Sequence, residues 1–204
     1  MTSPRPIAII ANGEPPQHAE VLKALAQCQA CVCCDRLPPA GAPTLLQVVG
    51  DLDSFTGELA PELLTDLHED QETNDLTKAM NWLAKTHPGT PIDYFAVTGL
   101  REDHTLANLA LIAEAGRPAR VFTESGRFDL LGAGTTPLHT TPNTPISFLS
   151  FTSQVISARG VVWPVEHLLL DTLWRATLNR TTASTVEITC ERPLFVYRPW
   201  KACL

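Results

Sequence analysis

The sequence predicts an α/β protein of two domains: an N-terminal doubly wound domain with a mostly parallel sheet over residues 1–123, and a small C-terminal all-β sandwich over residues 124–204. Up to about residue 123, short apolar runs alternate with segments of helical periodicity, which is typical of a parallel sheet covered by helices. From about residue 124 that periodicity is absent, and short β-rich runs are punctuated by Gly, Pro, Asn and Thr. The second pattern is typical of an antiparallel β domain.

The strands expected in the first domain are short apolar runs, as in a parallel sheet that is covered on both faces. They span residues 7–11, 31–34, 45–49, 92–98 and 120–123. A helical face around Val21 and Leu25 separates the first two runs, and a helix with Leu106 and Leu109 on one face precedes the last.

The clearest helix is expected from about Asn74 to Thr86, where apolar residues recur at i, i+3, i+4 and i+7. Asn74 is a candidate N-cap, and Asp75 would lie in the first turn, where the helix dipole favours an acid.

The strands expected in the second domain span residues 128–131, 146–151, 155–157, 185–190 and 194–197. Residues 132–136 carry two glycines and resemble a phosphate-binding loop, but the Lys-Ser/Thr ending and the following helix of such a loop are absent from the sequence. We therefore expect a hairpin turn there.

Composition narrows the class of protein. Hydrophobic residues make up 44% and charged residues 18%, as in an ordinary globular chain rather than a disordered one. The net charge of -7, without a long Lys/Arg cluster, argues against a nucleic-acid partner. No apolar stretch has the length of a signal peptide core or a membrane span, so we expect a cytoplasmic protein that does not enter the membrane.

The six cysteines, in a chain without a recognisable secretion signal, indicate free thiols rather than a disulfide framework. Cys31, Cys33 and Cys34 lie in one expected strand, and no Cys/His pair at zinc-binding spacing accompanies them. We interpret them as small apolar filler of a buried strand.

Three aspartates are candidate ligands of a metal ion. Asp51 and Asp53 follow the strand at 45–49 with i, i+2 spacing, which places both carboxylates on one face of an extended chain. Asp75 opens the clearest helix. Three carboxylates suit a hard divalent cation such as Mg²⁺, which can bridge to substrate phosphates. For any one of them alone, a turn acid or a capping acid is the simpler interpretation.

Several polar residues fall just beyond expected strand ends: Asn12, Asp35, Asp51, Asp53 and Arg101. In doubly wound sheets ligands sit beyond the carboxyl ends of the strands, so the coincidence favours a binding site there. Gly13 would allow a tight turn or the close approach of backbone to a ligand, and a simple turn is an equal alternative.

If the ligand is a nucleoside triphosphate, further residues are candidates for binding it. Several of them also have a simpler structural interpretation. Lys78 is one helical turn from Asp75, but it could equally be an exposed helix lysine. Arg101 could bind phosphate bidentately. Asp103 could be the N-cap of the next helix, and His104 a structural histidine; Asn108 lies one turn beyond it.

Together these motifs resemble the thiamine pyrophosphokinase family. The resemblance is carried, in the same order and at similar separations, by Gly50-Asp51-Leu52-Asp53-Ser54, by residues 74–79, by Thr98-Gly99 and by residues 101–109. Downstream, Ile146-Ser147-Phe148 and residues 157–163, which end in Trp163, are similar to further segments of the family.

The resemblance implies transfer of the pyrophosphoryl group of ATP to the hydroxyl of thiamine, with Mg²⁺ as cofactor and AMP as product, by a homodimer with a thiamine pocket between its subunits. It implies that Asp51, Asp53 and Asp75 bind metal and, with Arg101, serve catalysis. It places the following residues at ATP: Asn12, Gly13, Asp35, Ser54, Asn74, Thr77, Lys78, Arg101, Asp103, His104 and Asn108. It places Ser147, Trp163 and Asn179 at thiamine.

The sequence departs from the family pattern in two places. Asp35-Arg36-Leu37-Pro38-Pro39 stands where the family has a glycine-containing stretch, and Leu178-Asn179 stands where it has a Ser-Asn pair. Two other functions stay open. A metal-dependent phosphohydrolase could use the same acids with water as nucleophile, and a catalytically silent nucleotide- or thiamine-binding protein could keep the fold.

Overall fold

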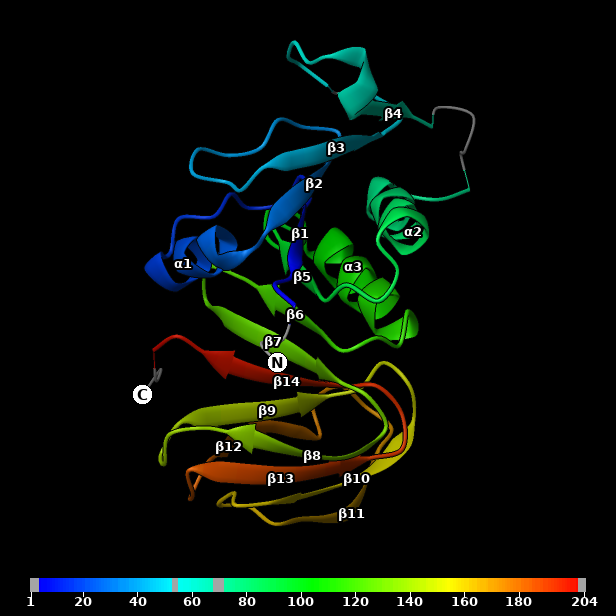
Figure 1. Ribbon diagram of the computed structural model, residues 1–204. Coiled ribbons are helices and arrows are strands. Elements are labelled where there is room, and N and C mark those ends of the chain that lie inside the picture. The colour runs from blue at the N-terminus through cyan, green and yellow to red at the C-terminus, as the bar shows by residue number, and fades with distance from the viewer. Residues whose placement is uncertain (1–3, 53–54, 68–71, 202–204) are drawn as a thin grey trace. The chain divides into compact units, whose positions relative to one another are not determined.

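The computed structural model describes residues 4–52, 55–67 and 72–201, and the chain divides into two units (Figure 1). The first unit comprises residues 1–109 and 121–124, and the second comprises residues 110–120 and 125–204. The chain therefore crosses between the units more than once, because residues 110–120 belong to the second unit and residues 121–124 to the first.

Parallel pairing builds the sheet of the first unit. Its strands are β1 (Ile7–Ile10), β2 (Ala30–Cys34), β3 (Leu45–Gly50), β4 (Leu64–Asp66), β5 (Ile92–Phe95) and β6 (Ala119–Phe122), in the spatial order β6-β5-β1-β2-β3-β4. The pairs β1–β2, β1–β5, β2–β3 and β3–β4 are all parallel. Every residue of β1 and β2 is buried, as expected for strands that are covered on both faces.

Helices cover both sides of these strands. They are α1 (Ala19–Gln27), α2 (Asp75–Thr86) and α3 (Glu102–Glu114), together with the short 3-10 turn η1 (Pro61–Leu63). In Figure 1 α1 lies on one side of the strands, and α2 and α3 lie on the other. The helix predicted at 74–86 is thus confirmed, with Leu76 and Leu83 buried on its inner face. The face predicted for the next helix is only partly buried, because Leu109 is buried whereas Leu106 is exposed.

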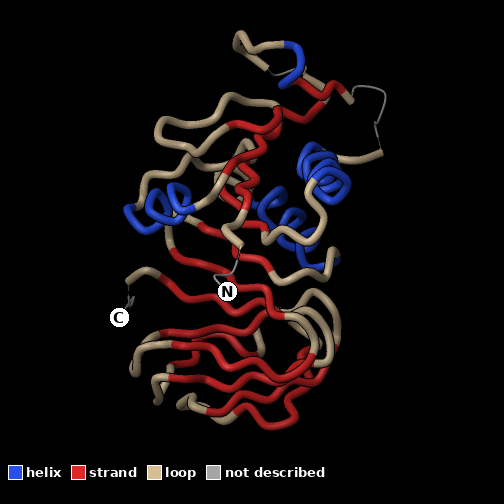
Figure 2. Tube along the Cα trace, in the orientation of Figure 1, coloured by secondary structure: helices blue, strands red, loops and turns tan. Residues whose placement is uncertain are grey.

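The second unit contains two sets of antiparallel strands, visible in the lower half of Figure 2. Its strands are β7 (Gly126–Leu131), β8 (Gly134–His139), β9 (Pro145–Leu149), β10 (Gln154–Arg159), β11 (Val165–Leu170), β12 (Ala176–Arg180), β13 (Thr185–Cys190) and β14 (Leu194–Pro199). One set has the order β12-β9-β14-β7, and the other has the order β11-β10-β13-β8.

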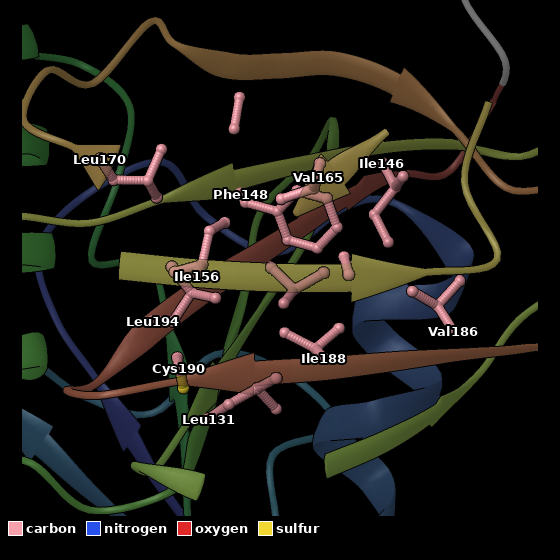
Figure 3. Packing of buried hydrophobic residues seen from close by; sticks show 13 residues of the cluster. Leu131, Ile146, Phe148, Ile156, Val165, Leu170, Val186, Ile188, Cys190 and Leu194 are labelled. Atoms are coloured by element: carbon pink, nitrogen blue, oxygen red, sulfur yellow. The ribbon is translucent and has the colours of Figure 1, made fainter. Parts of the chain in front are cut away.

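The two sets share one hydrophobic core. Ile146 and Phe148 of β9 pack with Ile156 of β10 and Ile188 of β13 (Figure 3). Along β9, β10 and β13 buried and more exposed residues alternate, so each strand turns one face to this core. Burying a side chain of this size contributes about 1.5–3 kcal/mol to folding.

The predicted hairpin at 132–136 is wrong. β7 pairs with β14, whereas β8 pairs with β13 in the other sheet, so the segment between β7 and β8 connects two sheets. The strands β4, β8, β11 and β12 were not predicted. β4 has only three residues, and β8 and β11 expose several successive residues, so alternation in the sequence is weak there.

The cysteines that the structure describes are buried thiols, and none of these is in a disulfide: Cys28, Cys31, Cys33, Cys34 and Cys190. This agrees with the prediction that Cys31, Cys33 and Cys34 are small apolar filler of a buried strand. Among the described residues, no helix has the length and apolar character needed to cross a membrane.

Candidate active site

Three carboxylates converge at the carboxyl ends of two neighbouring strands. Asp35 follows β2, Asp51 follows β3, and Asp75 begins α2. One carboxylate oxygen from each lies within 4.8 Å of the others. Asp35 is almost fully buried, and the other two are half-buried. Asp53 and Ser54, which were also predicted for this site, lie outside the described residues.

The backbone holds Asp35 in a conformation that ordinary residues rarely adopt. Its φ is +47°, in the left-handed region, and its N–H donates to the Val49 carbonyl over 3.1 Å. Gly50 lies against it, since a β-carbon at position 50 would sit 3.0 Å from the Asp35 β-carbon. Strain of this kind is typical of functional sites. The absence of a side chain at Gly50 therefore leaves room for the buried Asp35.

The start of α2 presents Asp75 to the same place. The predicted N-cap is confirmed, because the Asn74 side chain accepts hydrogen bonds from the Thr77 N–H and hydroxyl, both over 2.9 Å. Lys78 Nζ lies 3.5 Å from Asp75 Oδ1, and the lysine side chain is only 3% exposed. The alternative of an exposed helix lysine is therefore wrong. Lys78 places a buried positive charge beside the carboxylates.

The loops after β1 and β5 meet through their backbones. Gly13 donates its N–H to the Ala96 carbonyl over 2.6 Å, and Glu14 donates to the Thr98 carbonyl over 2.8 Å. Ala96 has a φ of +52°, which ends β5 before the predicted boundary at residue 98. The close approach that Gly13 allows is thus to a neighbouring loop of the same chain.

The start of α3 carries the predicted basic group. Arg101 binds Asp103 with two hydrogen bonds, from Nε over 3.1 Å and from Nη2 over 2.6 Å. This contact lowers the pKa of Asp103 to about 2. Asp103 is not the N-cap, since the helix already begins at Glu102. Asn108 donates from its side-chain amide to the Val97 carbonyl over 2.8 Å, which ties α3 to the loop after β5.

A cavity of about 490 Å³ lies among these elements. Seven predicted residues line it: Asn12, Gly13, Asn74, Asp75, Arg101, His104 and Asn108. Asp35, Asp51, Thr77, Lys78 and Asp103 are not in its wall. The remaining wall was not predicted as functional: Ala11, Cys34, Leu76, Val97, Gly99, Leu100 and Ala107. Such a mixed polar and apolar wall is typical of small-molecule sites.

Cys34, a wall residue that was not predicted, directly precedes Asp35 in the sequence. Its thiol donates to the Asp75 carbonyl over 3.7 Å. Burial raises the pKa of this thiol, and the charges of Asp75 and Asp35 raise it further. Cys34 is therefore a protonated wall residue rather than a nucleophile. Its position directly before Asp35 at a strand end was the signal that could have revealed it.

The donor set fits a hard divalent cation. Asp35, Asp51 and Asp75 offer only carboxylate oxygens, which are the ligands that Mg²⁺ prefers, and their spacing allows one ion to contact all three. Asp35 thus takes a place in the cluster beside two of the three predicted metal ligands.

The three residues predicted for the second substrate come together in the second unit. Asn179 donates from Nδ2 to the Trp163 carbonyl over 2.8 Å and accepts from the Trp163 N–H over 3.2 Å. Ser147 Oγ accepts from the Leu178 N–H over 3.1 Å. Asn179 is buried, whereas 57% of Trp163 is exposed. Asn179 therefore holds the backbone of Trp163 and leaves the indole at the surface.

Two protein-family models match the chain. A family model described as thiamin pyrophosphokinase, catalytic domain, matches residues 22–122. A second, described as thiamin pyrophosphokinase, substrate-binding domain, matches residues 131–197. No curated protein sequence matches the chain.

Solved structures with similar folds include three thiamine pyrophosphokinases. The Bacillus subtilis protein is 20% identical with a TM-score of 0.76, over 96% of this chain and 99% of that one. The Geobacillus thermodenitrificans protein is 18% identical with a TM-score of 0.78, over 97% and 98%. The yeast protein is 13% identical with a TM-score of 0.75, over 98% and 87%.

Proposed function

The chain belongs to the thiamin pyrophosphokinase family, and we propose that it transfers the pyrophosphoryl group of ATP to the hydroxyl of thiamine, yielding thiamine diphosphate and AMP. The observation that carries this proposal is that the cluster of three carboxylates adjoins the cavity through one of its members. Asp75 belongs to both, and Arg101 lines the same cavity. A nucleoside triphosphate needs this combination of a cation site, a cationic side chain and a pocket for its organic part.

We assign ATP to the cavity of the first unit. Arg101 is held by Asp103 at the cavity wall, where its guanidinium can neutralise charge on a phosphate group. His104 and Asn108 follow on the same face of α3 and line the same space. The apolar wall residues Leu76 and Val97 suit the base of a nucleotide better than its phosphates.

We assign Mg²⁺ to Asp35, Asp51 and Asp75, with Asp53 as a further candidate ligand. When bound, the ion would supply charge neutralisation at the transferred phosphates. Lys78 holds the Asp75 carboxylate from within the fold. Fixed positions of the acids lower the cost of arranging the charged groups during transfer.

We assign thiamine to the surface around Trp163, where an exposed indole can stack on a planar cationic heterocycle. Ser147 and Asn179 order the neighbouring backbone. A homodimer with this surface at its interface, and a cytoplasmic location, stay predictions of this proposal.

One assay separates the candidate functions. The protein is incubated with Mg-ATP, with and without thiamine, and AMP and phosphate are measured. AMP that forms only with thiamine supports the pyrophosphokinase. Phosphate release without thiamine would instead indicate the phosphohydrolase, and nucleotide or thiamine binding without turnover would indicate the silent binding protein.

A charge-neutral variant then tests the metal site. Asp51→Asn should lower kcat by about two orders of magnitude or more, because a carboxylate ligand is lost with little change of shape. Asp171→Asn removes an acid that is half exposed and paired with Arg175 in the second unit, so it should keep full activity. Full activity of Asp51→Asn would contradict the assignment of the cation site.

A further inference from the structure

A second cavity lies within the second unit. It has a volume of about 410 Å³ and is lined by the ends of β7, β8 and β14 and by the segment after β8: Arg127, His139, Thr140, Thr141, Thr144, Arg198, Pro199 and Trp200. None of the residues assigned to ATP, metal or thiamine lines it. The cavity is therefore formed by other residues than those assigned to the proposed transfer reaction.

Two arginines face each other across this cavity wall. Arg127 of β7 and Arg198 of β14 are register partners in an antiparallel pair, so their side chains leave the sheet on the same face. Like charges directly opposite each other on two strands are destabilising. Their side chains are only 26% and 16% exposed, so water screens the repulsion poorly.

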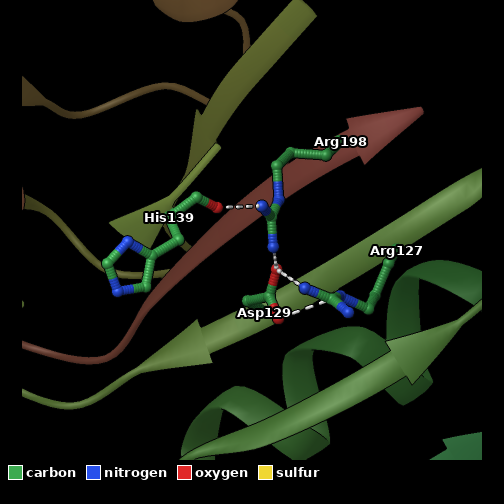
Figure 4. Close-up of polar contacts among 4 residues, drawn as sticks. All are labelled: Arg127, Asp129, His139 and Arg198. Atoms are coloured by element: carbon green, nitrogen blue, oxygen red, sulfur yellow. Dashed lines mark hydrogen bonds and ion pairs between the residues drawn. The ribbon is translucent and has the colours of Figure 1, made fainter. Parts of the chain in front are cut away.

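A single carboxylate lies between them. Arg198 Nη2 donates to Asp129 Oδ2 over 2.6 Å, and Arg127 Nη2 donates to the same oxygen over 3.2 Å (Figure 4). Arg127 Nε also lies 3.0 Å from Asp129 Oδ1. Arg198 Nη1 donates to the His139 carbonyl over 2.9 Å, which fixes its direction. Two guanidinium groups thus share one carboxylate.

Among the residues that the structure describes, this wall therefore carries two guanidinium groups that share one carboxylate. Burial lowers the pKa of Arg127, and the charges of Arg198 and Arg120 lower it further, against the raising effect of Asp129. Among the described residues, the cavity lining has no Asp or Glu, and it adds the hydroxyl-bearing Thr140, Thr141 and Thr144. A partly buried, excess cation beside such groups is an environment that favours an anion.

We propose that this cavity binds a phosphate group, either as free phosphate or as a small phosphate ester. Phosphate offers several acceptor oxygens, which the forked guanidinium groups and the threonine hydroxyls can meet together. The indole of Trp200 in the same wall offers a flat apolar surface for the organic part of an ester.

Calorimetric titration of the metal-free protein with inorganic phosphate and with phenyl phosphate tests the proposal. EDTA is present and ionic strength is constant, so that the carboxylate cluster of the first unit holds no cation that could attract phosphate. We expect saturable binding of at least one probe at one site, with a dissociation constant of about 1 mM or lower. Absence of binding for both probes would overturn the proposal.

The variants locate the binding. Arg127→Gln should weaken it about tenfold or more, because a charge-assisted contact is lost, and Arg127→Lys should weaken it less. Arg159→Gln removes an arginine whose side chain is 86% exposed and serves as the matched control. Equal affinity of Arg127→Gln and wild type would place the phosphate elsewhere and refute the site.

Asp129→Asn separates binding from a purely structural role of the cluster. The variant leaves both arginines without their shared carboxylate, so phosphate should raise its Tm more than it raises the Tm of the wild-type protein. An equal or smaller rise would show that the cluster only holds the strands together, against the proposal.

If phenyl phosphate binds more tightly than phosphate and Trp200→Ala removes the difference, the ligand is an ester. Equal affinities indicate the free ion.

The result does not depend on the proposed transfer reaction. Binding is measured without ATP, thiamine or metal, so an inactive protein can still bind phosphate here, and an active one can fail to bind it.

Discussion

Gly13 lies so close to Ala96 that a β-carbon at position 13 would sit 2.4 Å from the Ala96 carbonyl oxygen. It would lie equally close to the carbonyl oxygen of Thr98, at 2.4 Å. Both obstacles are backbone atoms, which cannot rotate away as a flexible side chain can. The loop after β1 and the loop after β5 therefore fit closely against each other at the wall of the cavity that we assign to ATP.

Gly13→Ala should lower the free energy of unfolding by about 1–3 kcal/mol, because the added methyl group must push two loops apart. Urea denaturation measures this, and a raised KM for ATP should accompany it. Gly132→Ala is the control, since a β-carbon there meets only the edge of Pro118 at 4.0 Å. Equal stability of the two variants would show that the loops after β1 and β5 yield easily.

Lys78→Met should make the protein depend more on Mg²⁺ for its stability. The variant keeps the length of the buried side chain but removes the positive charge beside Asp75, which should cost about 1–3 kcal/mol without metal. Because a bound cation can replace that charge, Mg²⁺ should raise the Tm of this variant more than that of the wild-type protein.

Lys85→Met changes an exposed lysine of the same helix and should leave the effect of Mg²⁺ on Tm unchanged. If Lys78→Met responds to Mg²⁺ no more than Lys85→Met does, Lys78 does not compensate the carboxylates.

The carboxyl group of Asp103 should titrate near pH 2 in the folded protein, below the usual value of about 3.9. The hydrogen bond from Arg101 is the main cause. Since the folded pKa is lowered, any stabilisation from this pair is present above about pH 3.9 and is lost as the pH falls through about 2.

Carbon-13 NMR of the carboxyl groups measures the pKa directly. In Arg101→Gln the Asp103 pKa should rise towards its ordinary value, whereas Arg117→Gln, just beyond the other end of α3, should leave it in place. An Asp103 pKa near 4 in the wild-type protein would contradict the paired geometry.

Leu178→Gly should stabilise the fold and impair thiamine use. Leu178 is 82% exposed, and its backbone has a φ of +61°, in the left-handed region. Glycine adopts this conformation without the steric strain that a leucine side chain causes. Relief of that strain should add about 1 kcal/mol to the free energy of unfolding. The backbone N–H that donates to Ser147 is kept in the variant, but the backbone next to Asn179 gains freedom, so KM for thiamine should rise.

Unfolding by urea and initial rates with varied thiamine give the two readouts. Leu169→Gly serves as a control, because this leucine is exposed but lies within the strand β11, where glycine should destabilise. A Leu178→Gly variant that is more stable and has an unchanged KM would remove this surface from the thiamine site.

The parallel half of the fold was predictable because its strands are buried on both faces and its best helix is strongly amphipathic. The runs at 7–11 and 45–49 need no partner to be recognised, and Asn74 with Asp75 marks the start of α2 by local chemistry. The antiparallel half was harder. β8 and β11 expose successive residues, so the two-residue alternation that identifies a strand is weak in their sequences.

The candidate site could be predicted where polar residues follow strands, as Asp35 and Asp51 do. Burial of Lys78 could not be predicted, because helical spacing places it beside Asp75 without showing what covers it. Nor could the role of Gly13, whose neighbours at Ala96 and Thr98 are distant in sequence and depend on the left-handed turn that ends β5.

The carboxylates of Asp35, Asp51 and Asp75 come from three separate segments of the chain, which meet only when β2, β3 and α2 have packed together. A divalent cation shared by all three would therefore act as a reversible cross-link between those segments. Like a disulfide, it would close long loops of the chain, but its strength would follow the concentration of the free ion. The ion that serves the chemistry would then also determine how firmly this edge of the sheet is held.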